Sequence, residues 1–123
     1  MGAPMSDLGV TTIFDGKRCT ITVAGEARLE TARAFEDAGR EIEERAATDV
    51  AVTQVLVDMR GLAFMDSASA GMLLRLQLQL RERGGVLVLF GLRRLVSRLL
   101  DRTGLDAQFQ CAETEAEALA LFP

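Results

Sequence analysis

Two short runs near the start of the chain alternate between apolar and polar positions. Residues 11–14 and 18–24 are rich in β-branched side chains, and Asp15, Gly16 and Lys17 lie between the two runs. An Asp-Gly pair between such runs is typical of a β-hairpin. The pattern therefore predicts two antiparallel strands, and Gly25 is expected to end the second strand.

After Gly25 the apolar spacing changes from two residues to three or four, which is the spacing of a helix. Glu36 precedes Arg40 by four residues, and Glu41 precedes Arg45 by four. This order favours ion pairs along a helix surface. The segment predicts a surface helix whose buried stripe is Leu29, Ala32, Phe35, Ala38, Ile42 and Ala46.

The middle of the chain predicts a strand, a helix and a second strand. The first strand covers residues 52–59, and its apolar run at 55–57 is expected to be covered on both faces. Residues 71–85 alternate leucine with polar residues, but they include no β-branched side chain, so a helix is favoured. Gly84 and Gly85 are expected to stop that helix. The continuous apolar run at 86–90 predicts a central strand.

A helix, a short strand and a final helix are expected in the remaining residues. A short strand is expected near residues 108–111, and Thr114 with Glu117 matches a capping box for a last helix that reaches Phe122. The helix before them is expected to stop at Gly104, and its helical spacing comes from Leu92, Leu95, Val96, Leu99 and Leu100.

This order of elements predicts a single α/β domain. Strands joined through helices form right-handed crossovers in a parallel sheet, and a hairpin at one end makes the sheet mixed. The expected domain covers residues 10–123, with about four or five strands and about four helices, and residues 1–9 are expected to be flexible. A length of 123 residues is enough to bury one core.

The composition excludes several classes of function. There is no histidine, so a Ser-His-Asp or Cys-His catalytic arrangement cannot be built. A formal charge of −4 argues against nucleic acid as a partner. No apolar stretch reaches the ~18 residues of a membrane span, and no signal peptide is recognisable. Cys19 and Cys111 are expected to be buried thiols in a reducing cytoplasm.

Residues 64–72, Phe-Met-Asp-Ser-Ala-Ser-Ala-Gly-Met, place three polar side chains where a helix is expected to begin. The simplest hypothesis is that Asp66 or Ser67 caps the helix. A phosphate-binding loop lacks its glycines and its lysine, and a serine nucleophile would depend on Lys17, the sole lysine. A phosphorylation switch is the remaining hypothesis, because the helix dipole favours an added anion on the first turn.

These residues, with others along the chain, resemble the STAS domain family of bacterial anti-sigma factor antagonists. The resemblance spans nearly the whole chain. It rests on the segment VLVDMRGLAFMDSASAGMLL together with VAGEARLETA, GGVLVLFGL, LLDRTGLDAQFQ and TEAEAL, in this order.

The resemblance implies a regulatory binding protein without a cofactor or a metal, not an enzyme. In that family an unphosphorylated antagonist binds an anti-sigma factor that is also a serine kinase, and thereby releases the sigma factor. Phosphorylation of a serine breaks the complex and a phosphatase restores it. ATP would belong to the kinase. The resemblance leaves undecided whether the protein forms a homodimer.

The chain departs from the family pattern at two places. The usual loop has a hydroxyl residue where this chain has Ala68 and a glycine where it has Ser69, and an aspartate usually lies at the position of Arg28. Stressosome relatives carry the phosphate on the residue after the aspartate, which favours Ser67 over Ser69 as the acceptor. The expected partner-binding residues are Arg28, Asp66, Ser67, Ser69, Met72 and Arg93.

One alternative is left open by the family resemblance. Some STAS relatives act without phosphorylation, as scaffolds of stressosome type or as subunits of lipid-transport ABC systems that bind an ATPase. In that case the serines at the start of the helix would only cap it.

Overall fold

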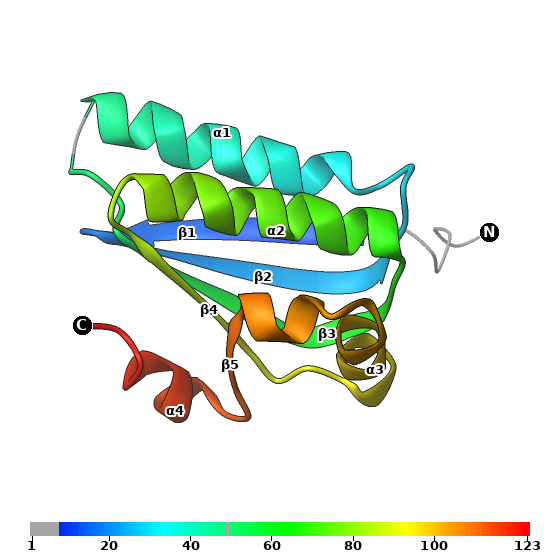
Figure 1. Cartoon of the computed structure of the whole chain (residues 1–123). Helices are drawn as coiled ribbons and strands as arrows, with labels where there is room; N and C mark the ends of the chain where they lie inside the picture. Colours follow the sequence, from blue (N-terminus) through cyan, green and yellow to red (C-terminus); the bar gives the residue numbers. More distant parts are fainter. Residues whose placement is uncertain (1–7, 49) are drawn as a thin grey trace.

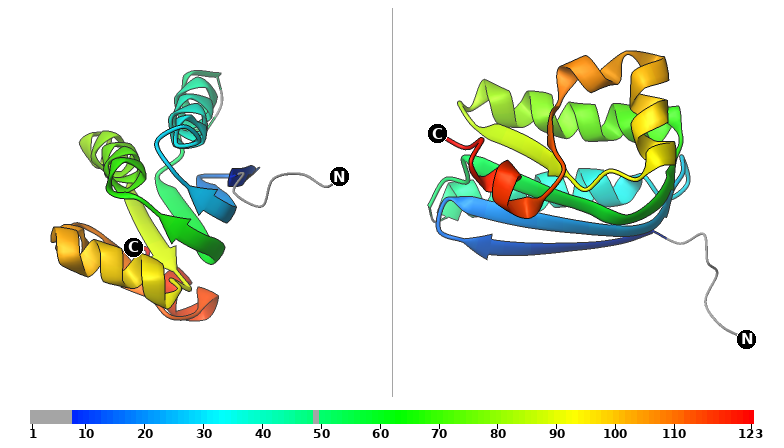
Figure 2. Two further views of the ribbon diagram at one scale, coloured as in Figure 1. Left: turned by 90° about the vertical axis from the view of Figure 1, so that its right-hand side faces the viewer. Right: turned by 90° about the horizontal axis from the view of Figure 1, so that it is seen from below.

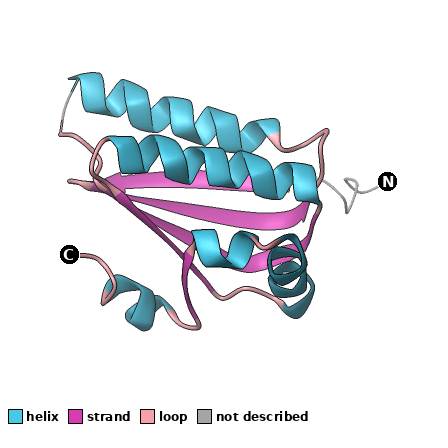
Figure 3. Ribbon diagram, in the orientation of Figure 1, coloured by secondary structure: helices cyan, strands magenta, loops and turns pink. Residues whose placement is uncertain are grey.

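A five-stranded sheet in the order β1-β2-β3-β4-β5 organises the fold of the computed structural model, which describes residues 8–48 and 50–123. The predicted α/β class with a mixed sheet and four helices is confirmed (Figures 1 and 3). The strands are β1 (Leu8–Asp15), β2 (Arg18–Ala27), β3 (Gln54–Met65), β4 (Val86–Phe90) and β5 (Gln110–Ala112). The helices are α1 (Arg33–Thr48), α2 (Ser67–Glu82), α3 (Arg94–Thr103) and α4 (Glu115–Leu119), with a 3-10 turn η1 (Leu105–Gln108).

The hairpin predicted at the start of the chain is present, but its second strand is longer than expected. β1 pairs antiparallel with β2, and Asp15 lies opposite Arg18 across the turn at Gly16 and Lys17. Gly25 does not end β2, which continues to Ala27. Gly25 has a φ of 103°, and the pairing of β2 with β3 shifts register between Gly25 and Glu26, so the strand passes the glycine through a bulge.

The strand expected at residues 52–59 also runs further, to Met65. Its second half has no partner in β4, because the β3–β4 pairing ends at Asp58 and Phe90. It pairs instead with the extended end of β2, up to Ala27 opposite Met65. The extended strands β2 and β3 therefore finish side by side at their carboxyl ends. The run at 55–57 is fully covered, as predicted.

The helices divide between the two faces of the sheet. Apolar side chains of α1, α2 and α3, such as Phe35, Leu73 and Val96, pack with inward-facing residues of β2, β3 and β4 into the main core. A smaller core on the opposite face joins Phe90 to Ala118 of α4. Figures 1 and 2 show α1 and α2 side by side over one face and α4 against the other.

Two apolar residues assigned to buried helix faces are exposed. The spacing predicts Leu29 on the buried stripe of the first helix, but α1 begins only at Arg33, and the Leu29 side chain is 68% exposed. Leu95 lies on α3 as expected, yet it is 61% exposed, because Val96 and Leu100 with the partly buried Leu99 supply the core-facing side of that helix.

Two further expectations concern the leucine-rich segment and the two cysteines. The helical choice for the leucine-rich segment is confirmed by α2, and its buried Gln77 donates a hydrogen bond to the Gln108 carbonyl oxygen. Cys19 is buried but Cys111 is exposed, because β5 lies at the edge of the sheet.

The ends of the chain also differ from the expectations. The last helix stops at Leu119, before Phe122. Of the expected flexible start, residues 1–7 lie outside the described residues, and residues 8 and 9 belong to β1. In the part of the chain that the structure describes, no helix has the length and apolar character that crossing a membrane requires.

Candidate functional site

The candidate site lies where the parallel strands end. The carboxyl ends of β2, β3 and β4 lead into loops at residue 28, residue 66 and residue 91. The loops at 28 and 66 meet at the carboxyl ends of the strands, since Ala27 pairs with Met65, whereas the loop after β4 begins earlier along β3, because Phe90 pairs with Asp58. Ligand and partner sites of α/β proteins commonly form at this end of the strands, since loops there are free to carry functional side chains.

Asp66 is the N-cap of α2. Its backbone is extended, with φ −92° and ψ 172°, and its Oδ1 accepts a hydrogen bond from the Ser69 amide at 2.8 Å. The Ser69 hydroxyl donates to the same Oδ1 at 2.7 Å. Of the two residues that could cap the helix, the structure therefore selects Asp66, and Ser67 becomes the first residue of the helix.

The two serines of this loop have different environments. Ser69 has no exposed surface, and its hydroxyl is held by Asp66. Ser67 is exposed, as is Ala68 beside it. A cap placed at Asp66 frees the Ser67 hydroxyl from any capping role, because the amides of the first turn bond to the cap residue. Ser67 is therefore the more accessible of the two hydroxyl groups.

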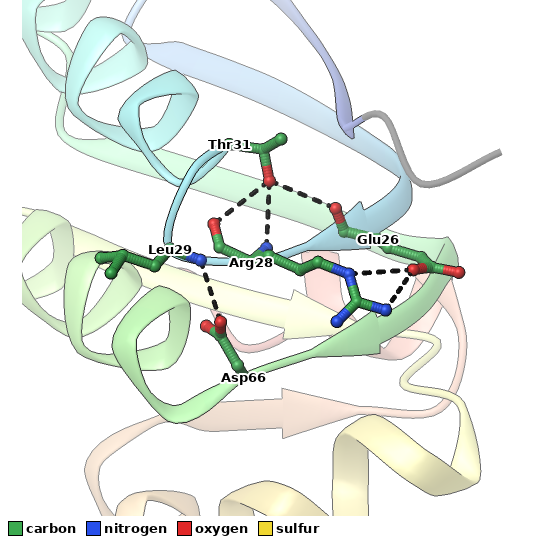
Figure 4. Close-up of polar contacts among 5 residues, drawn as sticks. All are labelled: Glu26, Arg28, Leu29, Thr31 and Asp66. Atoms are coloured by element: carbon green, nitrogen blue, oxygen red, sulfur yellow. Dashed lines mark hydrogen bonds and ion pairs between the residues drawn. The ribbon is translucent and has the colours of Figure 1, made fainter. Parts of the chain in front are cut away.

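Asp66 also joins α2 to the loop after β2. Its second carboxylate oxygen, Oδ2, accepts a hydrogen bond from the Leu29 amide at 2.9 Å (Figure 4). The Asp66 amide donates to the Ala27 carbonyl at 2.9 Å. The side chain and the backbone of one residue thus hold the 28–32 loop against the start of α2.

Thr31 shapes the 28–32 loop from within. Its Oγ1 accepts a hydrogen bond from the Arg28 amide at 3.0 Å and lies 3.2 Å from the Arg28 carbonyl oxygen (Figure 4). The Thr31 and Ala32 amides donate to the same Arg28 carbonyl. This tight turn keeps the Leu29 amide directed at Asp66, while the Leu29 side chain points to solvent.

The Arg28 side chain is fixed by two neighbours. Its Nη2 lies 2.6 Å from a Glu26 carboxylate oxygen, and its guanidinium lies 4.4 Å from the centre of the Phe64 ring. The Arg28 side chain is 42% exposed, so part of the guanidinium remains open to solvent. Arg28 is therefore a preorganised cation at the rim of the site.

The Asp66 carboxylate stays charged. Its partial burial raises its pKa, but hydrogen bonds from the Ser69 hydroxyl, the Ser69 amide and the Leu29 amide, together with the charge of Arg28, outweigh that effect. The pKa of Asp66 is therefore lowered from its ordinary value. A charged cap accepts stronger hydrogen bonds than a neutral one, which stiffens the junction.

The remaining predicted site residues lie further away. Arg93 belongs to the loop after β4, and its Nε donates to the Arg60 carbonyl oxygen at 3.0 Å. Met72 is half-buried on the second turn of α2 and lines a small pocket between α1 and α2. The structure thus brings Arg28, Asp66, Ser67 and Ser69 together, places Arg93 on a neighbouring loop, and separates Met72 from them.

Leu29 is the site residue that the sequence pattern concealed. Its spacing fits a helix stripe, but no N-cap residue precedes it, and that absence was the available signal for a turn. Together with Arg28, Ser67 and Ala68, Leu29 forms a set that we name the Ser67 surface; Arg28 is half-buried and the other three are exposed. Among residues 8–48 and 50–123, no cluster of three or more acidic, cysteine or histidine side chains could hold a metal ion.

The chain belongs to the STAS domain family. A family model described as "Mlab, STAS domain" matches residues 10–112, which is most of the chain. The matched region begins in β1 and ends with β5, so it includes the Ser67 surface. The resemblance stated from the sequence is thereby confirmed.

Solved structures of anti-sigma factor antagonists share the fold. The protein from Mycobacterium paratuberculosis is 21% identical, with a TM-score of 0.80, over 99% of this chain and 98% of that chain. SpoIIAA in its unphosphorylated form is 24% identical, with a TM-score of 0.71, over 90% and 93%. The phosphorylated form of this Bacillus cell fate determinant is 23% identical, with a TM-score of 0.65, over 91% and 97%.

Proposed function

We propose that the protein is an anti-sigma factor antagonist of the cytoplasm, that it binds an anti-sigma factor serine kinase through the Ser67 surface, and that phosphorylation of Ser67 ends this binding. A phosphatase restores the unmodified form. The chain itself supplies no catalytic group and no cofactor in this cycle. Family membership and the fold shared with SpoIIAA support the proposal.

The observation that carries the proposal is the bonding of the Asp66 carboxylate. One side chain caps α2 through Ser69 and holds the 28–32 loop through the Leu29 amide. Two loops that are far apart in the sequence thus form one rigid surface around an exposed serine. A rigid surface loses little entropy when a partner docks, so it favours protein–protein recognition.

Phosphate on Ser67 would act on the partner rather than on the fold. The added group carries about −1.5 to −2 charges at neutral pH, and it would lie on the first turn of α2, where the helix dipole favours an anion. The helix therefore tolerates it. A partner that docks against a neutral hydroxyl beside the charged Asp66 would instead meet two neighbouring negative groups.

Arg28 supplies a cationic contact in this proposal. Glu26 and Phe64 hold its guanidinium in place, so a partner carboxylate loses little free energy in ordering it. We expect Arg28→Ala to weaken kinase binding by at least about fivefold, since a preorganised contact exceeds an ordinary exposed ion pair of about 0.2–1 kcal/mol. The matched control is Arg40→Ala, which removes an exposed, ion-paired arginine of α1 and should change affinity less than about twofold.

The direct test is phosphorylation by the kinase that the chain captures from its source cell. After incubation with ATP, trypsin, which cleaves after arginine, releases residues 61–75 as one peptide that follows Arg60 and ends in Arg75. Fragment ions then separate Ser67 from Ser69. We expect phosphate on Ser67, none in the Ser67→Ala variant, and normal modification of the folded Ser69→Ala variant. Phosphate on Ser69 alone, or on neither serine while the complex still forms, would overturn the switch.

A second function has one observation in its favour. Ala68, at the position of the usual hydroxyl in the family pattern, is exposed and cannot accept phosphate. The chain would then be an adaptor that binds an ATPase of a lipid-transport system without being modified. Capture of a transporter ATPase whose binding is unaffected by Ser67→Ala, together with unmodified Ser67, would select this function.

A further inference from the structure

A second surface lies beside β5, the edge strand opposite β1 in the sheet. A groove of about 900 Å³ runs between α3 and η1 on one side and α4 on the other. The edge strand β5 runs between η1 and α4 (Figure 1), and its residues Cys111 and Ala112 are among those that line the groove. No residue of the Asp66 capping network lines this groove, although Gly91 and Leu92 of its lining directly precede Arg93.

The interior of the groove is apolar and its rim is acidic. Leu100, Phe109 and Leu121 provide apolar lining, and Leu121 is 44% exposed. Asp106, Glu113 and Glu117 also line it, and all three are exposed. No arginine or lysine of the described residues lines the groove. The lining therefore carries three carboxylates and no cation around an apolar centre, although α3 also carries the exposed arginines Arg94, Arg98 and Arg102.

Cys111 belongs to the lining and behaves as a neutral group. Its thiol pKa is raised, first by the desolvation of its surroundings and then by the charge of Asp106. A raised thiol pKa disfavours the reactive thiolate, so a redox role for this residue is not indicated. The same residue nevertheless gives the groove a chemical reporter, because Cys19, the second cysteine, is buried and its thiol pKa is raised to about 12.

The edge of β5 determines the shape of ligand that fits. β5 pairs in parallel with β4 on one side, and the other side faces no strand of the described chain. An open strand edge offers backbone donors and acceptors to an added strand. Alternate side chains of such a strand would reach the apolar lining and the acidic rim.

We infer that this groove binds an extended basic segment of a partner protein, which adds as a strand along β5 and pairs its cationic side chains with Asp106 and Glu113. The occupant is cationic because the lining holds three carboxylates and, among the described residues, no basic group. It is extended because β5, whose residues Cys111 and Ala112 line the groove between the helices, has no strand of the described chain paired on its outer side.

The probe for this inference is a fluorescein-labelled heptapeptide that alternates lysine and valine, with a peptide of glutamate and valine as its control. We expect the lysine peptide to bind with a micromolar Kd in anisotropy measurements, and the glutamate peptide not to bind. The Asp106→Asn/Glu113→Gln variant should weaken binding by about threefold to tenfold. Glu117 is left unchanged, because its side chain belongs to the capping box of α4.

A charge-matched variant tests whether the peptide binds in the groove or only through general attraction to an acidic protein. Glu44→Gln/Glu82→Gln removes two exposed carboxylates from α1 and α2, away from the groove, and should change affinity less than about twofold. Equal weakening in both double variants would overturn the inference. So would binding of the glutamate peptide with similar affinity.

Alkylation of Cys111 locates the bound peptide. We expect saturating lysine peptide to slow maleimide labelling of Cys111 at least fivefold, and Leu121→Asn to weaken peptide binding. An unchanged labelling rate with peptide bound would place the peptide elsewhere and overturn the inference. Self-association in sedimentation velocity that disappears in Asp106→Asn/Glu113→Gln would identify a second copy as the occupant, which also overturns it.

Discussion

The Leu29 amide donates a hydrogen bond to Oδ2 of Asp66 at 2.9 Å, across 37 residues of sequence. The other oxygen of the same carboxylate accepts from the amide and the hydroxyl of Ser69. Each oxygen therefore serves a different segment, one the 28–32 loop and one the start of α2. Removing or neutralising the carboxylate should loosen both segments at once.

Replacing Asp66 with alanine is expected to destabilise the fold by about 2 kcal/mol, the upper part of the range for loss of an N-cap. The cost lies there because the Leu29 amide and the buried Ser69 hydroxyl also lose their acceptor. Asp66→Asn keeps one acceptor oxygen and should cost about half as much. Urea unfolding measures both, with Glu30→Ala as an exposed control from the same loop. A cost for Asp66→Ala no larger than that of the control would contradict the bridging role.

The lowered pKa of Asp66 predicts a dependence of stability on pH. A carboxyl group whose pKa is lowered in the folded state contributes stability above its unfolded pKa of about 3.8, and this contribution disappears as the pH falls through the lowered folded pKa. The difference in unfolding free energy between wild type and Asp66→Asn should therefore be constant near neutral pH and shrink below about pH 4.

Asp58 requires a control in that experiment, because its pKa is also lowered, first by the side-chain hydrogen bond from Arg60. Comparing two proteins that share Asp58 removes its contribution from the difference. A gap between wild type and Asp66→Asn that widens as the pH falls below about 4 would be inconsistent with a lowered Asp66 pKa.

Most of the fold followed from the periodicity of the sequence. The hairpin, the apolar strand at 86–90 and the capping box at Thr114 and Glu117 are local patterns, and each is present. The extensions of β2 and β3 were not predictable in this way, because Gly25 and Gly61 usually interrupt strands. Here the two strands support each other, with Gly25 opposite Leu62 and Ala24 opposite Gly61 beyond the end of β4.

The candidate site was predictable in its residue types but not in its geometry. Asp66 and the serines were identifiable as a helix start, since their side chains prefer that position. Which serine is exposed depends on which residue caps the helix, because each residue of a helix is turned by about 100° from the last. The role of Leu29 depends on a hydrogen bond to a residue far along the chain, which local spacing cannot reveal.

Replacing Ser69 with alanine should destabilise the fold, whereas Ser67→Ala should not. The Ser69 hydroxyl is buried and donates to a charged oxygen, so its loss is expected to cost about 1–2 kcal/mol. Ser67 is exposed, and the cap bonds join Asp66 to Ser69 instead, so replacement of Ser67 should stay within about 0.5 kcal/mol. Thermal or urea unfolding measures the pair. Equal effects of the two substitutions would contradict the assignment of Ser69 to the cap.

Ser67→Glu should separate binding from folding. A carboxylate on the first turn of α2 gains from the helix dipole, and its repulsion from Asp66 offsets that gain, so the unfolding free energy should change by less than about 0.5 kcal/mol. The same carboxylate alters the centre of the Ser67 surface. If the proposed partner docks against a neutral hydroxyl, its affinity should fall at least tenfold in Ser67→Glu and remain near wild type in Ser67→Ala. Calorimetric titration with the captured kinase measures both variants, and undiminished binding of a folded Ser67→Glu variant would refute control of the complex by charge at this position.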